Sequence, residues 1–253
     1  MKASPFEYRF RFALHAILFT LGFWAPWNRW LHLDPAGPNA HVWGLLAVDV
    51  TRLGIGTISS AFNALLVVGI VCAMAAAALR TWGAAYLGAS VVESGQMHTA
   101  QAIPATGILQ DGPFRYVRNP LYLGTFFHSI ALSMLMPRSG AIFTLVTIGL
   151  LQLRLIFAEE SFLAAKLGPP YAAYCALVPR LFPTLRPALP TTGLAPRWPQ
   201  AFLGEIHMWG VALSFAFAGW RYDAGLLIKC VIVSLGVSLI ARALKPASAV
   251  APA

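Results

Sequence analysis

The stretch DGPFRYVRNPLYLG, residues 111–124, places charged and hydrogen-bonding side chains directly before a long apolar run. Asn119 is a favourable helix N-cap, and proline is favoured at the first helical position because it lacks an N–H that would stay unpaired there. The pattern therefore predicts a helix that begins at Pro120. A helix N-terminus carries about half a positive charge, so this end, with Arg115 and Arg118 beside it, can bind a carboxylate or phosphate. The alternative is that both arginines only anchor the chain at a membrane interface.

The composition is that of an integral membrane protein. Of the 253 residues, 58% are hydrophobic and only 11% are charged, whereas a soluble domain has about one quarter charged residues. In a membrane protein a net charge of +9 sets orientation and meets anionic lipid headgroups, and no motif indicates nucleic-acid binding. The three cysteines and six histidines are scattered, so we expect neither a disulfide framework nor a metal site.

The apolar runs predict an all-α, polytopic protein with about six transmembrane helices, five to seven in all, and an interfacial amphipathic helix. The first run ends in a bulky aromatic cluster without a small-residue cleavage site, so we expect it to be retained. Residues 42–58 are ambiguous and either cross the membrane or lie in it without crossing. Asp49 and Arg52 lie three residues apart there and can pair on one helical face. The predicted spans are 12–27, 61–79, 121–136, 141–158, 202–220 and 224–244.

Two long polar segments separate these spans. Residues 80–119 contain no apolar run of spanning length, and residues 159–186 have the pattern of an amphipathic interfacial helix with a proline-rich exit. The spans 121–136 and 141–158 flank a short turn, which predicts an antiparallel hairpin with both polar ends at one membrane face. We divide the chain into N-terminal helices (1–79), a core (80–186), a C-terminal hairpin (187–245) and a disordered tail (246–253).

The basic residues indicate which side the polar segments face. If residues 42–58 do not cross, both termini and both polar segments share one side with twelve Lys and Arg residues, against four on the other side. Cytoplasmic loops carry the excess of basic residues. We therefore expect the polar face to be cytoplasmic.

Charged residues inside predicted spans need an explanation, because charge at membrane depth is costly and usually paired or functional. Arg154 lies shortly before Glu159 and Glu160, so we expect it to line the same pocket as residues 111–124. Lys229 lies near a span end, where its side chain can reach the interface. Adjacent glutamates point about 100° apart around a helix, so we expect one to enter the site. The alternative is that both only mark the end of a span.

Four motifs in order carry a family resemblance: RNPLYLG (118–124), EESFL (159–163), LGPPYAAY (167–174) and VPRLFP (178–183). Together they resemble the isoprenylcysteine carboxyl methyltransferase and phospholipid methyltransferase superfamily, over about residues 80–183. The resemblance implies a multi-span enzyme that binds S-adenosylmethionine at the cytoplasmic face and methylates a lipophilic acceptor from the bilayer. Two features depart from the family pattern: Asn119 replaces its usual histidine, and no arginine closely follows the glutamate pair.

The resemblance and the residue chemistry together suggest roles. Arg115, Arg118 and the helix end suit the carboxylate of the cofactor, and a glutamate of the pair suits its ammonium group. Gly124 lets the cofactor approach the helix backbone, and Tyr122 offers an aromatic face or a hydroxyl near the sulfonium. The expected cofactor-binding residues are Arg115, Arg118, Asn119, Pro120, Tyr122, Gly124, Glu159, Glu160 and Tyr171, and the expected catalytic residues are Arg154, Glu160 and Tyr122.

The acceptor stays open at this stage: a prenylcysteine carboxylate, a phospholipid, an isoprenoid or another lipid, with membrane lipids as further partners. Two alternative functions also stay open. One is an NADPH-dependent membrane sterol-type reductase, which shares part of this architecture. The other is a non-enzymatic membrane scaffold, which would not need residues 118–120 and 159–160 to meet in space.

Overall fold

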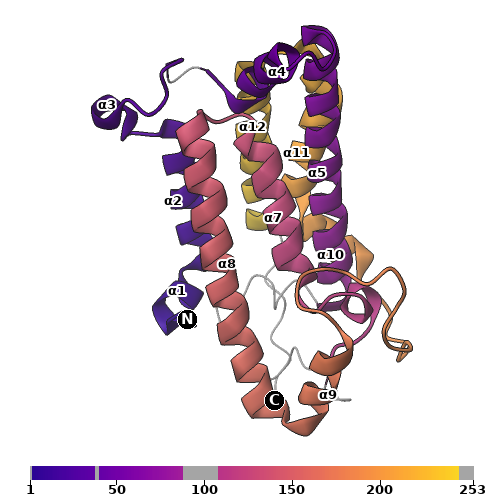
Figure 1. Ribbon diagram of the computed structural model, residues 1–253. Coiled ribbons are helices and arrows are strands. Elements are labelled where there is room, and N and C mark those ends of the chain that lie inside the picture. The colour runs from indigo at the N-terminus through magenta and orange to yellow at the C-terminus, as the bar shows by residue number, and fades with distance from the viewer. Residues whose placement is uncertain (1, 38–39, 88–107, 245–253) are drawn as a thin grey trace.

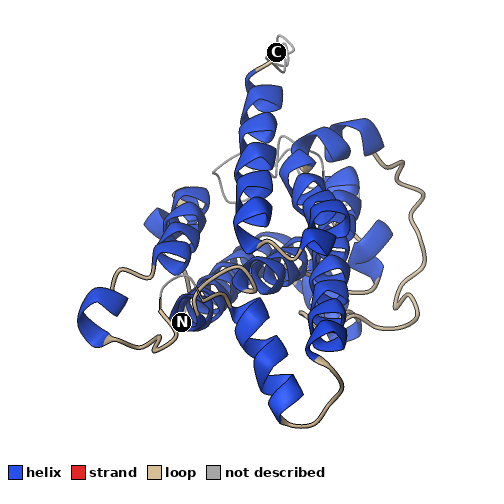
Figure 2. Cartoon of the chain, turned by 90° about the horizontal axis from the view of Figure 1, so that it is seen from above, coloured by secondary structure: helices blue, strands red, loops and turns tan. Residues whose placement is uncertain are grey.

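The computed structural model describes residues 2–37, 40–87 and 108–244. Within these residues every extended regular element is a helix (Figures 1 and 2), which confirms the all-α class. The predicted tail, 246–253, lies outside the described residues, as does the middle of the predicted polar segment 80–119. The helices are α1 (Pro5–Arg9), α2 (Arg11–Trp24), α3 (Asn28–Leu31), α4 (Val42–Arg52), α5 (Ile58–Leu87), α7 (Pro120–Ser133), α8 (Arg138–Leu167), α9 (Pro169–Leu177), α10 (Trp198–Gly204), α11 (Ile206–Leu213) and α12 (Ala224–Ala243).

Three of the described helices, α5, α8 and α12, are long and apolar enough to cross a membrane. The pair formed by α10 and the helical residues 206–221 passes the same test but is bent by 67°, so it is one broken span or a re-entrant loop. Both α2 and α7, which coincide with predicted spans, have only 14 residues. A full crossing takes about 20 apolar residues. By length and composition the described residues therefore hold three or four spans.

Two helices extend past their predicted ends. The span predicted to end at residue 79 continues as α5 to Leu87, through Arg80, whose charge is neutralised by Glu205. The span predicted to end at residue 158 continues as α8 to Leu167, so the glutamate pair lies inside a continuous helix. The prediction of one amphipathic helix that begins at Glu159 is wrong, because these residues are divided between the end of α8 and α9. Gly168, at a φ of +63°, ends α8 and starts α9 in a new direction.

Residues 42–58 do not form a crossing helix. The helix α4 stops at Arg52, and the chain then turns through two glycines at positive φ before α5 begins. The first turn of α4 is fixed to the chain just after α7 by backbone hydrogen bonds from Val42 to Met136 and from Trp43 to Met134, both 2.9 Å. Figure 1 shows α4 at that end of the molecule. The predicted pairing of Asp49 with Arg52 is wrong, because docking of α4 brings Asp49 to within 2.8 Å of Arg138 at the start of α8.

The predicted hairpin is confirmed: α7 and α8 are antiparallel neighbours joined by a short turn (Figure 1). On one side α7 packs along α5, and on the other side α8 packs along α2. The contact between α2 and α8 is very close at Gly22 and Gly140, because a Cβ added to Gly140 would lie 1.9 Å from the Gly22 carbonyl oxygen. Both α2 and α12 contribute side chains to the lining of a central cavity.

Candidate active site

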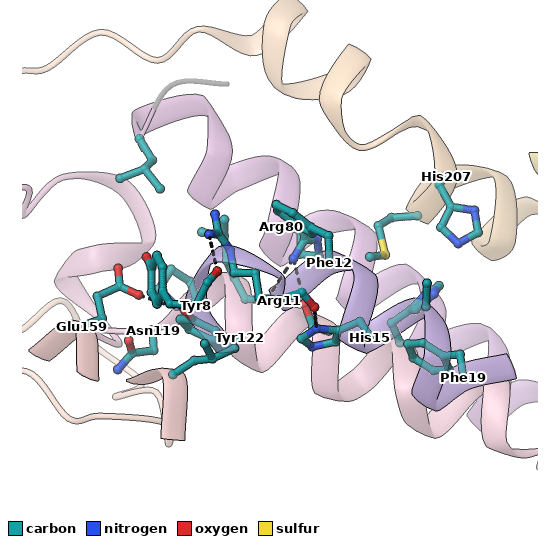
Figure 3. Close-up of a pocket in the computed structure, with 18 of the residues that line it drawn as sticks. Tyr8, Arg11, Phe12, His15, Phe19, Arg80, Asn119, Tyr122, Glu159 and His207 are labelled. Atoms are coloured by element: carbon teal, nitrogen blue, oxygen red, sulfur yellow. Dashed lines mark hydrogen bonds between the residues drawn. The ribbon is translucent and has the colours of Figure 1, made fainter. Parts of the chain in front are cut away.

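A cavity of about 850 Å³ lies among α2, α5, α7, α8, α9, α11 and α12. Figure 3 shows that its lining changes character along its length: Glu159, Asn119 and Tyr122 gather at one end, and His207 and Phe19 lie at the other. We call the first group the polar end, lined by Tyr8, Arg118, Asn119, Pro120, Tyr122, Glu159, Glu160 and Tyr171. We call the second the apolar lobe, lined by Phe19, Phe23, His128, Leu132, His207, Met208, Ile228 and Val231.

Glu160 is the centre of the polar end. Its side chain is 9% exposed, and one carboxylate oxygen accepts hydrogen bonds of 2.9 and 2.8 Å from the guanidinium of Arg180. The other oxygen accepts from the Asn119 amide at 3.1 Å and lies 3.4 Å from Nε of Arg118. A buried carboxylate is stable only when it is paired and hydrogen-bonded in this way. Glu160 thus joins α8 to the start of α7 and to the chain after α9.

The helix start at Pro120 is confirmed, but the expected cap is not made. The Asn119 side chain makes no capping hydrogen bond to α7. Its amide instead donates to Glu160 and to the Arg180 carbonyl oxygen, each at 3.1 Å. Asn119 therefore ties the start of α7 to Glu160 and to the backbone of Arg180 instead of capping the helix.

Glu159 meets a different set of groups from its neighbour. The Tyr122 hydroxyl donates to a Glu159 carboxylate oxygen at 3.0 Å, and Glu159 is only partly buried. Tyr8 of α1 lines the same end of the cavity. Both glutamates of the pair therefore line the cavity, where the sequence predicted only one. The cavity is wide enough to contact two adjacent positions of α8, which point about 100° apart.

Two tyrosines of α9 close the polar end. The Tyr174 hydroxyl donates to the Phe114 carbonyl oxygen at 2.9 Å, and the rings of Tyr171 and Tyr174 lie 5.9 Å apart. Burial raises the pKa of both hydroxyls above the ordinary value. Both tyrosines are therefore neutral at physiological pH and can only exchange hydrogen bonds or present ring faces.

The segment before α7 is held by the chain that follows α9. Backbone hydrogen bonds run from Arg118 to Pro179, from Thr184 to Tyr116 and from Ala188 to Arg115. The carboxylate of Asp111, 2% exposed, accepts from Thr191 and Thr192. Burial acts to raise the pKa of Asp111, but these hydrogen bonds lower it below its ordinary value. The chain segment that precedes α7 is thus held in place by residues 179–192, which follow α9 and which we call the clamping segment.

Between the two ends of the cavity lies Arg80, an ion-paired residue of α5. Its Nε and a terminal nitrogen donate to the two oxygens of Glu205 at 2.7 and 2.8 Å, and its other terminal nitrogen donates to Thr125 at 2.8 Å. Glu205 is 3% exposed and lies at the bend between α10 and α11. This buried pair fixes the bent helix against α5 and α7.

Residues 64–169 match the family model described as phospholipid methyltransferase. We call these residues, which are similar to that family, the methyltransferase-family segment. The match confirms the resemblance for α7, α8 and most of α5, which is less than half of the chain. No curated protein and no solved structure gives a significant match. The methyltransferase-family segment thus supplies Arg118, Asn119, Tyr122 and both glutamates of the polar end.

Seven of the predicted site residues meet in the cavity lining, namely Arg118, Asn119, Pro120, Tyr122, Glu159, Glu160 and Tyr171. Three others do not line it. The Arg115 side chain donates to the Leu189 carbonyl oxygen at 2.7 Å and so holds the clamping segment. Gly124 faces α5, where an added Cβ would lie 2.7 Å from Cγ of Arg80. This position serves close packing of α7 against α5, and the predicted contact of Gly124 with a cofactor is not supported by it.

Arg154 is the third predicted residue that the structure places elsewhere. It binds Glu7 of α1 through two hydrogen bonds of 2.9 and 2.8 Å. Five helical positions separate it from Glu159, which corresponds to about 140° around the axis. Because the side chain points away from the cavity, a catalytic role for Arg154 is not supported by its position. The pKa of Glu7 is lowered to about 2, chiefly by its hydrogen bonds from Arg154.

The sequence reasoning missed residues of the site that lie outside the methyltransferase-family segment. Arg180 pairs with Glu160 at 2.8 Å although it lies 20 residues after it in the chain, and its presence in VPRLFP was the available signal. Tyr8 and Arg11 reach the cavity from the N-terminal helices, and His128 and His207 line the apolar lobe. Isolated residues such as these give no sequence signal, because their partners come from distant helices.

Proposed function

We propose that the protein transfers a methyl group from S-adenosylmethionine to a lipophilic acceptor in the membrane. A methyltransferase-family segment in a membrane protein supports the coarser activity. The observation that carries the finer proposal is the single cavity that joins a charged end to an apolar lobe. A zwitterionic, water-soluble cofactor suits the first, and a hydrocarbon chain suits the second.

The polar end fits the groups of such a cofactor. Nε of Arg118 is buried and has no hydrogen-bond acceptor, and an unmade bond of this kind is costly unless a ligand supplies an oxygen. A cofactor carboxylate would supply it. Glu159, which is less enclosed than Glu160, suits the ammonium group, and the rings of Tyr122 and Tyr171 suit a cationic sulfonium. When bound, S-adenosylmethionine would provide an electrophilic methyl group.

Other residues of the polar end hold these proposed cofactor-binding residues in place. Glu160 and Asn119 fix the orientation of Arg118 and of the start of α7, and Arg180 balances the charge of Glu160. Alignment of two reactants can supply about 7–11 kcal/mol of a barrier. We infer that positioning of this kind, rather than acid–base chemistry at the sulfur, is the main contribution of the protein.

The polar end is proposed to face the cytoplasm. In Figure 1 the N-terminus, α9 and the ends of α5 and α8 that bear the site lie together, opposite α4. With α4 not crossing, the count of twelve basic residues against four applies to these two faces, and the positive-inside rule selects the first. Cysteine labelling in intact cells tests this orientation: a residue placed at position 186 should be protected and one placed at 138 should react.

The central test is binding of S-adenosylhomocysteine, the demethylated product, to the purified protein by calorimetry in detergent. We expect saturable binding that Arg118→Gln weakens, while the exposed Arg186→Gln leaves it unchanged. Mass spectrometry of lipid extract incubated with protein and labelled S-adenosylmethionine should then reveal a labelled lipid. Binding of NADPH and not of the homocysteine derivative would overturn the proposal in favour of a reductase.

A further inference from the structure

Two histidines lie in the apolar lobe, where the surrounding side chains offer them few polar contacts. His128 of α7 is 3% exposed, and its ring centroid lies 5.4 Å from that of His207 of α11 at an angle of 74°. Phe19 packs edge-on against His128 at 6.0 Å, and Figure 3 shows Phe19 and His207 at the same end of the cavity. Within the described part of the chain no hydrogen bond joins the two rings. Polar groups at such a depth are costly and usually serve binding or transport.

The proton on His207 can be assigned from its neighbour. The hydroxyl of Ser234 on α12 has one proton, and it donates to the Val231 carbonyl oxygen at 2.8 Å. The Ser234 oxygen can therefore only accept from Nδ1 of His207, 3.1 Å away. In a neutral imidazole the other ring nitrogen then carries a lone pair. His207 thus offers Nε2 as a hydrogen-bond acceptor.

The opposite assignment applies to His128. Its Nδ1 is buried and has no hydrogen-bond partner. An orphaned buried N–H is rarer in proteins than an unpaired acceptor, so the proton belongs on Nε2. The two histidines therefore present one donor and one acceptor, both at the wall of the same cavity.

We propose that His128 and His207 form a subsite for a hydroxyl group on the lipophilic ligand. A hydroxyl oxygen can accept from Nε2–H of His128 while its proton is donated to Nε2 of His207, which satisfies all three groups. A ketone or an ether oxygen satisfies only His128, and a hydrocarbon satisfies neither. The subsite deepens the proposed function, because it assigns the methyl acceptor to the class of lipophilic alcohols or phenols. The subsite concerns recognition of the hydroxyl group only and does not specify which atom of the acceptor is methylated.

The test is equilibrium binding of tritiated farnesol to the purified full-length protein in nanodiscs, without any cofactor. Unlabelled farnesol, its methyl ether and the saturated C15 hydrocarbon serve as competitors. We expect the alcohol to compete up to about tenfold better than the ether, because the ether lacks the one hydrogen bond donated to His207. His207→Phe, which keeps a planar ring beside His128 but removes the acceptor that only the alcohol can use, should reduce that ratio to about two or less.

Matched variants separate recognition from packing. Thr20 also lines the cavity, but its hydroxyl is already bonded to the Ala16 carbonyl oxygen, so Thr20→Val should keep the tenfold preference. Ser234→Ala removes the oxygen that fixes the His207 proton on Nδ1. This variant should lower the alcohol-over-ether preference without abolishing it. Equal competition by alcohol, ether and hydrocarbon in the wild-type protein, or no saturable farnesol binding, would overturn the subsite. Binding of S-adenosylhomocysteine is measured separately, so loss of the proposed function and loss of the subsite give different results.

Discussion

The polar end and the apolar lobe of the cavity differ in how far the protein itself bonds their buried polar groups, although each has one buried nitrogen without a partner, Nε of Arg118 and Nδ1 of His128. In the polar end, both oxygens of Glu160 are bonded by Arg180 and Asn119. In the apolar lobe, the two histidines contact each other without a hydrogen bond, and within the described residues Nε2 of neither ring has a hydrogen-bond partner. The first region is organised by the protein itself. The second leaves a hydrogen-bonding requirement that a ligand can meet, so it is the region where selectivity for the ligand is expected.

The two regions also come from different parts of the chain. The polar end is built largely by α7 and α8, inside the methyltransferase-family segment. The apolar lobe is built largely by α2, α11 and α12, which lie outside it. If the polar end holds the cofactor and the apolar lobe holds the acceptor, as proposed, the acceptor can differ without loss of cofactor binding. The following variants test whether the two regions are independent.

The largest effect is expected from Glu160→Gln in the polar end. The amide cannot balance Arg118 and Arg180, and hydrogen bonds to charged groups contribute about 1.5–3 kcal/mol each. We expect the Kd of S-adenosylhomocysteine to rise about 100-fold, or about 2.7 kcal/mol, by calorimetry. Glu7→Gln is the matched control, because it also breaks a two-point arginine pair but lies outside the cavity lining. Similar losses in both variants would contradict a special role for the polar end.

A second variant, Gly140→Ala, acts on the support of the apolar lobe. The added methyl would meet the Gly22 carbonyl oxygen at 1.9 Å, so α2 must move away from α8, at a cost of about 1–3 kcal/mol. We expect a lower Tm and weaker lipid binding with unchanged cofactor affinity. Gly149→Ala on the same helix meets nothing closer than 3.8 Å and should be neutral or stabilising. Equal weakening of cofactor and lipid binding by Gly140→Ala would show that the two regions are coupled.

Tyr122→Phe removes one hydrogen bond inside the polar end. The hydroxyl donates to Glu159 at 3.0 Å, so the variant should weaken cofactor binding about tenfold, or about 1.4 kcal/mol. The alcohol-over-ether preference of the apolar lobe should not change. Tyr222→Phe, which loses its bond to Asn63 elsewhere in the molecule, controls for a general loss of stability. A change in lipid preference in Tyr122→Phe would contradict independence.

The smallest effect concerns the clamp at Asp111. Its pKa is lowered in the folded protein, so its stabilising effect is complete above its ordinary pKa and disappears as the pH falls through the lowered value. We expect Asp111→Asn to lose about 1 kcal/mol at pH 7 and the difference from wild type to shrink below about pH 4. Thermal unfolding in detergent across pH 3–7 measures this. A difference that does not depend on pH would show that the carboxylate charge is not involved.

Much of the site followed from local sequence. The start of α7 at Pro120 and the hairpin of α7 and α8 were predicted correctly, since capping preference, proline geometry and apolar run length act over a few residues. The motifs also selected seven residues that meet in the cavity lining. The predictions failed where charge pairing decides the structure: α5 runs through Arg80, and Arg154 turns away from the site.

The sequence by itself determined the all-α membrane class, the helix starts and the family of the central segment, because these depend on hydrophobic runs and on short motifs. Only the tertiary structure decided the partners of the buried charges. Glu160 pairs with Arg180, Arg80 with Glu205, and Arg154 with Glu7. An ion pair in a low-dielectric interior forms between whichever groups helix packing brings within about 3–4 Å, and that distance is fixed by contacts among distant segments of the chain.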